Sequence, residues 1–234
     1  MTVEFLRVAG LHAFYGESHI LHGVDFSVTR GEVVTLLGRN GAGRTTTLKA
    51  LLGLVGSRSG SVMINGREAI ALPPHRIAQL GVGYCPEERG IYACLSAEEN
   101  LLVAPLVGSG GMPVEEIYGM FPNLRDRRDA QGTRLSGGEQ QMLAVARILR
   151  TGARLLLLDE ISEGLAPVIV QALSRTIQAL RGKGYTIVMV EQNFRFAAPL
   201  ADRFYVMEHG RMVEGFAASE LAGKMAMLHE FLGI

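Results

Sequence analysis

The segment from Val33 to Leu48 restricts the possible folds of this chain more than any other part of the sequence. It begins with a mostly apolar run, Val33–Leu37, continues through a glycine-rich stretch, and ends in Arg44-Thr45-Thr46-Thr47-Leu48. This order is typical of a buried strand, a tight turn and a helix, which together form a phosphate-binding loop. Glycines let the backbone approach an anion closely, and the free amides at the helix start point toward it. Thr45 is placed to give its hydroxyl to a magnesium ion.

The residue at the end of this loop departs from the common motif. Arg44 stands where the pattern G-x-x-x-x-G-K-[ST] has lysine. The positive charge is kept, but a planar guanidinium fork replaces a compact ammonium group. Because a charge-assisted hydrogen bond contributes about 1.5–3 kcal/mol, a partial loss of this contact weakens nucleotide binding roughly several-fold to tenfold. A glycine-rich turn with a purely structural role is the alternative that the loop alone leaves open.

Composition excludes several classes of protein. Lys plus Arg and Asp plus Glu number 23 each, so we expect no nucleic-acid partner. No run approaches the roughly 20 apolar residues of a membrane span, and the first residues, Met1-Thr2-Val3-Glu4, lack the features of a signal peptide. Cys85 and Cys94 have neither metal-binding nor redox spacing. These features fit a chain of 234 residues in the reducing cytosol, folded as one domain or two closely joined lobes.

Hydropathy patterns predict an α/β frame with a helical insert. We expect the core to comprise residues 1–95 and 151–234, and the insert to comprise residues 96–150. The expected strands are Glu4–Phe14, Ile20–Val28, Val33–Leu37, Gly60–Ile64, Val82–Cys85, Leu155–Leu158, Thr186–Val190, Phe204–Met207 and Arg211–Val213. Besides the helix that begins at Thr45, the main expected helices are Ala97–Val103, Val114–Phe121, Gly138–Leu149, Pro167–Leu180 and Ser219–Leu232.

Two carboxylates follow one of the buried strands. Asp159 and Glu160 come directly after the apolar run Leu155–Leu158, at the strand end where open α/β sheets bind ligands. One carboxylate suits the coordination shell of magnesium, and the other suits the polarisation of a water molecule. A buried structural pair is the alternative, although such a pair would need partners to offset its desolvation. The next strand ends at Glu191-Gln192, just past these carboxylates.

A serine-glycine-glycine turn precedes a strong helix in the insert. Its sequence is Leu135-Ser136-Gly137-Gly138-Glu139-Gln140. Free amides and a hydroxyl at a helix start form a site for an anion. Ser136 with Glu139 also fits a capping box, which is the structural alternative, and both roles can hold at once.

Together these segments resemble the ATP-binding subunits of ABC transporters, from Tyr15 to Arg211, with Leu135–Gln140 as the most specific element. The resemblance implies one ABC ATPase domain over residues 1–234 that binds ATP and Mg2+. Its implied α/β fold is a P-loop NTPase core, a mostly parallel sheet flanked by helices, with an N-terminal antiparallel β subdomain and a helical insert. It implies that Tyr15 stacks on adenine, that Thr45 and Asp159 hold the magnesium, and that Glu160 is the general base. The residues implied to hold the phosphates are Gly38, Arg39, Asn40, Gly41, Ala42, Gly43, Arg44, Thr45 and Thr46.

The resemblance also assigns roles outside the phosphate loop. Glu87 falls where the family usually has a glutamine that reaches the magnesium and the attacking water, and Gln192 falls where it usually has a γ-phosphate-sensing histidine. Ser162, Glu163 and Gly164 are implied to lie across the dimer seam. The residues implied to contact the nucleotide of the opposite subunit are Leu135, Ser136, Gly137, Gly138, Glu139 and Gln140.

Within the family, four segments look like one of the two ATPases of bacterial branched-chain amino-acid importers. They are Pro86–Gly90, Leu135–Leu143, Glu163–Pro167 and Val190–Asn193. In that group, glutamate at position 87 and glutamine at position 192 are ordinary. Ile161 stands where the family usually has proline.

The function expected from this resemblance is ATP hydrolysis that drives uptake of branched-chain or other hydrophobic amino acids. The implied partners are a second ABC ATPase subunit in a homodimer or heterodimer, membrane permease subunits, and indirectly a periplasmic solute-binding protein. The implied location is the cytoplasmic, inner face of the cell membrane. Apolar Ile91, Tyr92 and Leu95 suit either a docking surface for the permease or core packing of the insert.

Two other functions compete with this one. The first is a soluble ABC-type ATPase of DNA repair or translation, which the neutral charge disfavours. The second is a nucleotide-gated binding module that hydrolyses ATP weakly. Arg44 motivates the second alternative, and the intact pair Asp159-Glu160 argues against it.

Overall fold

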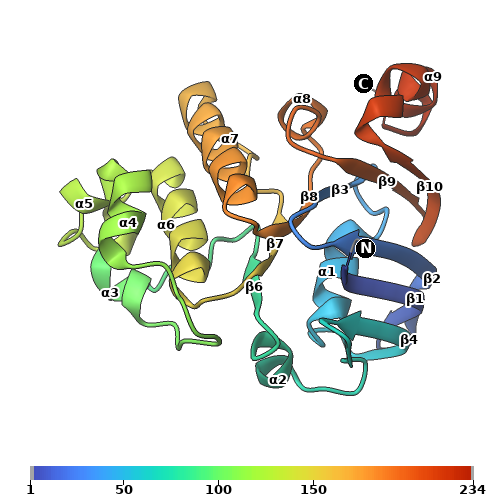
Figure 1. Cartoon of the computed structure of the whole chain (residues 1–234), viewed down its shortest axis with the longest axis horizontal. Coiled ribbons are helices and arrows are strands. Elements are labelled where there is room, and N and C mark those ends of the chain that lie inside the picture. Colours follow the sequence, from blue (N-terminus) through green and yellow to red (C-terminus); the bar gives the residue numbers. More distant parts are fainter. Residues whose placement is uncertain (1–2, 233–234) are drawn as a thin grey trace.

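A computed structural model describes residues 3–232 and contains two sheets (Figure 1). The six-stranded sheet has the order β10-β9-β3-β8-β7-β6. Its parallel strands are β3 (Val33–Leu37), β6 (Val82–Cys85), β7 (Leu155–Asp159), β8 (Thr186–Val190) and β9 (Arg203–Glu208), and β10 (Arg211–Ala217) runs antiparallel to β9. All residues of β3, β7 and β8 are buried, as is usual for parallel strands that are covered on both faces.

The second sheet is antiparallel and has the order β2-β1-β4-β5. It consists of β1 (Glu4–Tyr15), β2 (Ser18–Thr29), β4 (Ser57–Ile64) and β5 (Arg67–Glu68). One face of this sheet and the helix α1 (Arg44–Leu51) share a hydrophobic cluster with β3, β7 and β8. The phosphate loop therefore lies between the two sheets.

The helices form two groups. The segment between β6 and β7 contains α3 (Ala97–Leu102), α4 (Val114–Met120), α5 (Pro122–Asp126), the 3-10 turn η1 (Gly132–Arg134) and α6 (Gly137–Arg150). The other helical elements are α2 (Pro74–Ala78), α7 (Pro167–Gly182), α8 (Phe194–Ala197), the 3-10 turn η2 (Ala218–Glu220) and α9 (Leu221–Leu232). Figure 1 shows the first group at one end of the molecule and α9 at the other.

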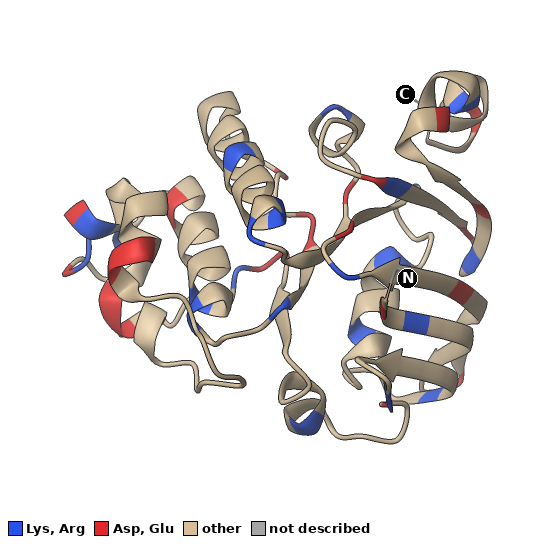
Figure 2. Cartoon of the chain, viewed as in Figure 1, with Lys and Arg blue, Asp and Glu red and all other residues tan. Residues whose placement is uncertain are grey.

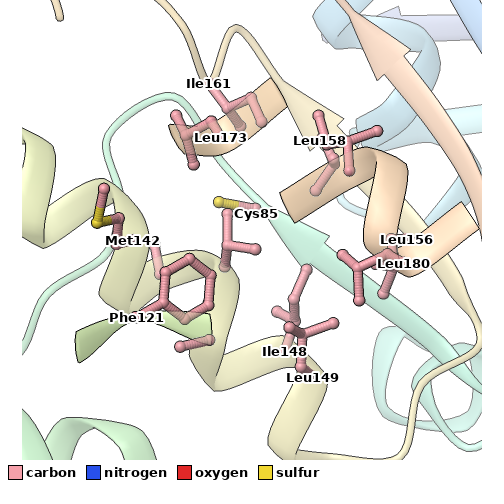
Figure 3. Packing of buried hydrophobic residues seen from close by; sticks show 14 of the residues in the cluster. Cys85, Phe121, Met142, Ile148, Leu149, Leu156, Leu158, Ile161, Leu173 and Leu180 are labelled. Atoms are coloured by element: carbon pink, nitrogen blue, oxygen red, sulfur yellow. The ribbon is translucent and has the colours of Figure 1, made fainter. Parts of the chain in front are cut away.

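The helical segment is joined to the main sheet by a shared hydrophobic core. Figure 3 shows Phe121, Met142 and Ile148 beside Cys85 and Leu156, so residues of α6 and its neighbours pack on the sheet. Capping boxes begin two of its helices: Ser96 with Glu99 at α3, and Ser136 with Glu139 at α6.

The α/β fold with an antiparallel β subdomain and a parallel sheet is as the sequence predicts. The patterns did not indicate β5, α5 or α8, and they placed most element ends within a few residues of those observed. The division into residues 1–95 with 151–234 and residues 96–150 stays a prediction. Between residues 3 and 232, no helix is long and apolar enough to cross a membrane.

Candidate active site

The loop between β3 and α1 has the geometry of an anion cradle. Gly41 and Gly43 adopt positive φ angles of 82° and 101°, which side-chain-bearing residues rarely adopt. A Cβ added to Gly38 would lie 2.6 Å from the carbonyl oxygen of Met207, so the backbone passes too close there for a side chain. No side chain of the described residues caps the start of α1. Its first amides are therefore available to a bound anion.

A cavity of about 440 Å³ opens over this loop. It brings the loop residues Asn40–Thr46 together with Glu87 and Glu160, and Ile20 and Glu163 complete it. The full lining is Ile20, Asn40, Gly41, Ala42, Gly43, Arg44, Thr45, Thr46, Glu87, Glu160 and Glu163. Basic, hydroxyl and carboxylate groups thus converge on one space at the carboxyl ends of β3 and β7.

Arg44 connects the loop to the carboxylate that follows β7. Its side chain is only 4% exposed, and its Nη2 donates to Glu160 Oε1 at 2.7 Å and to Asn40 Oδ1 at 3.2 Å. The Nη1 atom is buried and has no hydrogen-bond partner within the described part of the chain. A buried N–H group without an acceptor costs free energy, and an anion in the cavity would supply that acceptor.

Thr45 and Asp159 offer two neighbouring oxygens. Thr45 Oγ1 donates to Asp159 Oδ1 at 3.0 Å, and the Tyr84 hydroxyl donates to Asp159 Oδ2 at 3.0 Å. Burial raises the pKa of Asp159, and these two hydrogen bonds oppose the rise. A hydroxyl and a carboxylate fit a magnesium ion that also uses phosphate oxygens and waters. Described residues include no cluster of three or more His, Cys, Asp or Glu groups that could hold a metal alone.

Glu160 has an unusual backbone and an unusual acidity. Its φ angle is 47°, in the left-handed region where a residue other than glycine is strained. Burial, followed by the nearby Glu163 and Glu87, raises its pKa to about 7 although the charge of Arg44 opposes this. A carboxylate with a pKa near neutrality is well matched to general-base chemistry.

Gln192 lies in a neighbouring cavity of about 800 Å³ that Glu160 also lines. This cavity is lined by the seam loop (residues 162–164) and by the loop after β8, including Ser162 and Glu191. Glu191 is 2% exposed and accepts hydrogen bonds from Ser162. No sequence motif indicates a role for Tyr84, and the one signal for Glu191 is a carboxylate directly after a buried strand.

Some of the predicted residues lie away from the phosphate cavity. Tyr15 ends β1 with 42% of its surface exposed, and it lines neither cavity. Arg39 lies in a different hollow, of about 280 Å³, with His209 and Phe231.

The six residues Leu135–Gln140 form the turn and first part of α6, and none of them lines either cavity. The Ser136 hydroxyl accepts from the Glu139 amide at 3.3 Å, and Gln140 Nε2 donates to the Leu135 carbonyl at 3.1 Å. A Cβ at Gly138 would lie 2.7 Å from the Ile169 side chain, so α6 packs closely on α7 there. The turn forms the capping box that the sequence predicts. It lies outside the cavity over the phosphate loop of the same chain.

Comparison with known proteins identifies similar chains. The sequence pattern of a family described as "ABC transporter" matches residues 21–163. The chain is 39% identical to the high-affinity branched-chain amino acid transport ATP-binding protein BraG of Pseudomonas aeruginosa, covering 94% of this chain and 96% of that protein. It is 37% identical to a probable branched-chain amino acid transport ATP-binding protein, LivF, of Archaeoglobus fulgidus, with 92% and 93% covered. It is 32% identical to the lipopolysaccharide export system ATP-binding protein LptB of Acidithiobacillus ferridurans, with 98% and 97% covered.

Solved structures agree with the fold. A nucleotide-free ATP-binding cassette from an ABC transporter superposes with a TM-score of 0.84 at 22% identity, covering 98% of both chains. An ATP-binding subunit of an ABC transporter superposes with a TM-score of 0.80 at 27% identity, covering 95% of this chain and 94% of that one.

Proposed function

Because this chain belongs to the ABC transporter family and is an ATPase subunit, we propose that it powers an importer of branched-chain or other hydrophobic amino acids. The greater identity to relatives named for branched-chain amino acid transport than to those named for lipopolysaccharide export supports this substrate class. We also propose that it works on the inner face of the membrane, with permease subunits and a periplasmic binding protein.

The phosphate loop and Arg44 bind the triphosphate of ATP in this proposal. The backbone amides from Asn40 to Thr46 surround the phosphates, and the unpartnered Nη1 of Arg44 donates to one phosphate oxygen. Tyr15 stacks on the adenine from the exposed end of β1. Phosphoryl transfer depends chiefly on positioning and on charge neutralisation, and these groups supply both.

Thr45 and Asp159 would hold the magnesium ion, which supplies neutralisation of phosphate charge when bound. Tyr84 fixes the orientation of the Asp159 carboxylate through its second oxygen. Glu87 lines the same cavity and reaches toward the attacking water.

Glu160 accepts the proton of the attacking water and orients it toward the γ-phosphate. In the structure its Oε1 is engaged by Arg44 at 2.7 Å. Breaking a buried ion pair costs about 3–5 kcal/mol when one partner is left alone, so phosphate must replace Glu160 as the partner of Arg44. ATP binding then frees the general base at the moment when its substrate is present. Gln192 contacts the γ-phosphate from the adjoining cavity.

The turn Leu135–Gln140 completes the site of the opposite subunit. Ser136 and Gly137 lie at the exposed start of α6, where amides can meet a phosphate presented by a partner. ATP then bridges two subunits, hydrolysis separates them, and this opening and closing drives the permease. Either a second copy of this chain or a related ATPase fills the partner position.

The surface around residues 87–95 is the proposed docking site for the permease. Tyr92 is 52% exposed, whereas Ile91 and Leu95 are half-buried and Ile91 packs against the helical core, so the three apolar candidates differ in role. Leu102 of α3 is also exposed. Figure 2 shows acidic residues gathered on α3 and α4, of which Glu115 and Glu116 already pair with Arg125 and Lys183.

Purification from native membranes tests the transport proposal. A tagged chain should recover permease subunits together with a second ATPase or a second copy of itself, and deletion of its gene should abolish uptake of labelled leucine, isoleucine or valine. Recovery of a lipopolysaccharide export complex, or unchanged uptake of all three amino acids, would contradict the proposed substrate class.

A nucleotide-gated module with weak turnover is the second candidate. The ion pair between Arg44 and Glu160 favours it, because a base held by a buried guanidinium is unavailable until the pair opens. The two candidates differ in the turnover expected of Arg44→Lys, because a large rise would favour the gated module and little change would favour the transport ATPase.

A further inference from the structure

Glu191 is a buried carboxylate that the mechanism above does not use. It directly follows β8 with 2% of its surface exposed, and its partners are N–H and O–H donors. A carboxylate in such surroundings is costly, and an apolar residue of similar volume would pack there with less penalty. The strand end alone therefore gives no reason for an acid at this position.

The hydrogen bonds of Glu191 join two loops. The Ser162 backbone amide donates to Oε1 at 3.2 Å and the Ser162 hydroxyl donates to Oε2 at 2.9 Å, so both carboxylate oxygens bind the same residue. A third bond connects the same segments, because the Glu160 amide donates to the Val190 carbonyl at 2.9 Å. Three hydrogen bonds thus join residues 160–162 to residues 190–191.

Each of these loops carries a residue of the proposed reaction. Glu160 lies two positions before Ser162, and Gln192 directly follows Glu191. Glu160, Ser162, Glu191 and Gln192 line one cavity of about 800 Å³. The distance between the proposed base and the proposed γ-phosphate sensor therefore depends on the contact between Ser162 and Glu191.

We propose that Glu191 is a positioning residue that clamps the seam loop to the loop carrying Gln192, and so holds Glu160 and Gln192 in register for hydrolysis. The proposal rests on the function proposed above. Glu191 itself touches neither ATP nor water in the reaction. It acts through Ser162, at the point where the partner subunit would press on the seam loop.

Kinetics of three single variants and one double variant of the chain test the clamp. Glu191→Ala should lower kcat about tenfold and leave KM for ATP within about twofold, because a misplaced base slows chemistry without removing a nucleotide contact. Glu191→Gln should keep kcat within about threefold, because its amide oxygen can accept from the Ser162 amide and its NH2 can donate to the Ser162 hydroxyl. Ser162→Ala should lower kcat less than Glu191→Ala and add nothing to it in the double variant.

Several outcomes would overturn the clamp. They are a normal kcat for Glu191→Ala, an equal loss in Glu191→Ala and Glu191→Gln, or losses that add fully in the double variant. If Glu191→Ala does not fold, a normal kcat for Ser162→Ala would overturn it instead. A failure of the proposed function has a different signature, since the unaltered chain and Glu160→Gln would then hydrolyse ATP equally, and the clamp would fall with it.

Discussion

The two terminal nitrogens of Arg44 have different surroundings, and this difference suits an arginine better than a lysine. Nη2 is occupied by Glu160 and Asn40, while Nη1 is buried without an acceptor. A guanidinium can therefore donate to a phosphate through Nη1 before Nη2 leaves the carboxylate, so the exchange of partners avoids an unpaired buried charge. A lysine ammonium is a single point charge and cannot span both positions with a fixed geometry.

Replacement of Arg44 measures how much its shape matters. Arg44→Ala should weaken ATP binding by about tenfold or more, through loss of a charge-assisted contact to phosphate. Arg44→Lys should change both affinity and turnover by no more than about tenfold, because the charge remains. Fluorescent-nucleotide titration and ATP hydrolysis give the two quantities. A much larger rise in turnover for Arg44→Lys would favour the gated module over the motor.

Glu191 should make stability depend on pH. Burial raises its pKa to about 7 from an ordinary 4.5, with the Glu160 charge adding to the rise and the Ser162 hydrogen bonds opposing it. Between these values the folded chain keeps a proton that the unfolded chain has lost, so the free energy of unfolding falls as pH rises through this window.

Glu191→Gln cannot lose that proton and should remove this contribution. Relative to the unaltered chain, the variant should gain up to about 3 kcal/mol of stability at pH 8 and little at pH 4.5. Urea unfolding at the two pH values gives the comparison, and Glu160 is common to both proteins. An equal difference at both pH values would contradict a buried charge at position 191.

At the scale of elements, the turn from β3 into α1 depends on backbone freedom at Gly43. Its φ angle is 101°, and a Cβ there would lie 2.9 Å from Leu21 Cδ2 and 3.3 Å from Gly210 Cα. The conformation and the space therefore both exclude a side chain. The first turn of α1 would have to move, and the anion cradle with it.

Gly43→Ala should destabilise the chain by about 1–3 kcal/mol and abolish ATP binding. Gly119→Ala is the matched control, because Gly119 lies inside α4 with open space around its Cα, and alanine there should stabilise the helix by up to about 1 kcal/mol. Thermal unfolding and nucleotide titration give both effects. Normal ATP binding by Gly43→Ala would show that the loop tolerates another backbone path.

The sequence predicts those elements whose signals are local. The apolar runs of β3, β7 and β8 and the glycine-rich turn are each readable within a few residues. In contrast, α5 and α8 have five and four residues, which is too short for a helical period to emerge.

The contacts of the site are harder to predict because strand register creates them. Tyr84 reaches Asp159 across 75 positions, since Tyr84 of β6 pairs with Leu157 of β7. Arg44 reaches Glu160 across 116 positions, and Ser162 reaches Glu191 across 29. The residue types alone indicated phosphate, magnesium and base chemistry, but only the fold gives their partners.

At the scale of the whole molecule, the start of α6 lies outside the phosphate cavity, which fits the proposed sharing of ATP between two subunits. Ser136 lines neither of the two cavities beside Glu160, so the proposed contact of Ser136 with ATP would be made to the nucleotide of another chain. The capping box at Ser136 is compatible with this role, because it leaves the amides at the first helical positions free.

Ser136→Ala separates binding from assembly. The lost cap should cost about 1 kcal/mol of stability. Affinity for a nucleotide analogue at low protein concentration should stay the same, while turnover should fall by about tenfold or more as one contact to the partner's phosphate is lost. Denaturant unfolding, titration and hydrolysis give the three values. An equal loss of affinity in the dilute chain would place this turn in the site of its own subunit.

The most direct test of the account is magnesium-dependent ATP hydrolysis by the purified chain beside Glu160→Gln, with gel filtration of both proteins in ATP. If Glu160 is the general base, the unaltered chain hydrolyses ATP, and Glu160→Gln binds ATP but hydrolyses it at least about a hundredfold more slowly. We also expect Glu160→Gln to accumulate as an ATP-stabilised dimer. Equal turnover by the two proteins would contradict the assignment of Glu160 as the base. Binding without turnover in either would instead make the chain a gate that Arg44 holds closed.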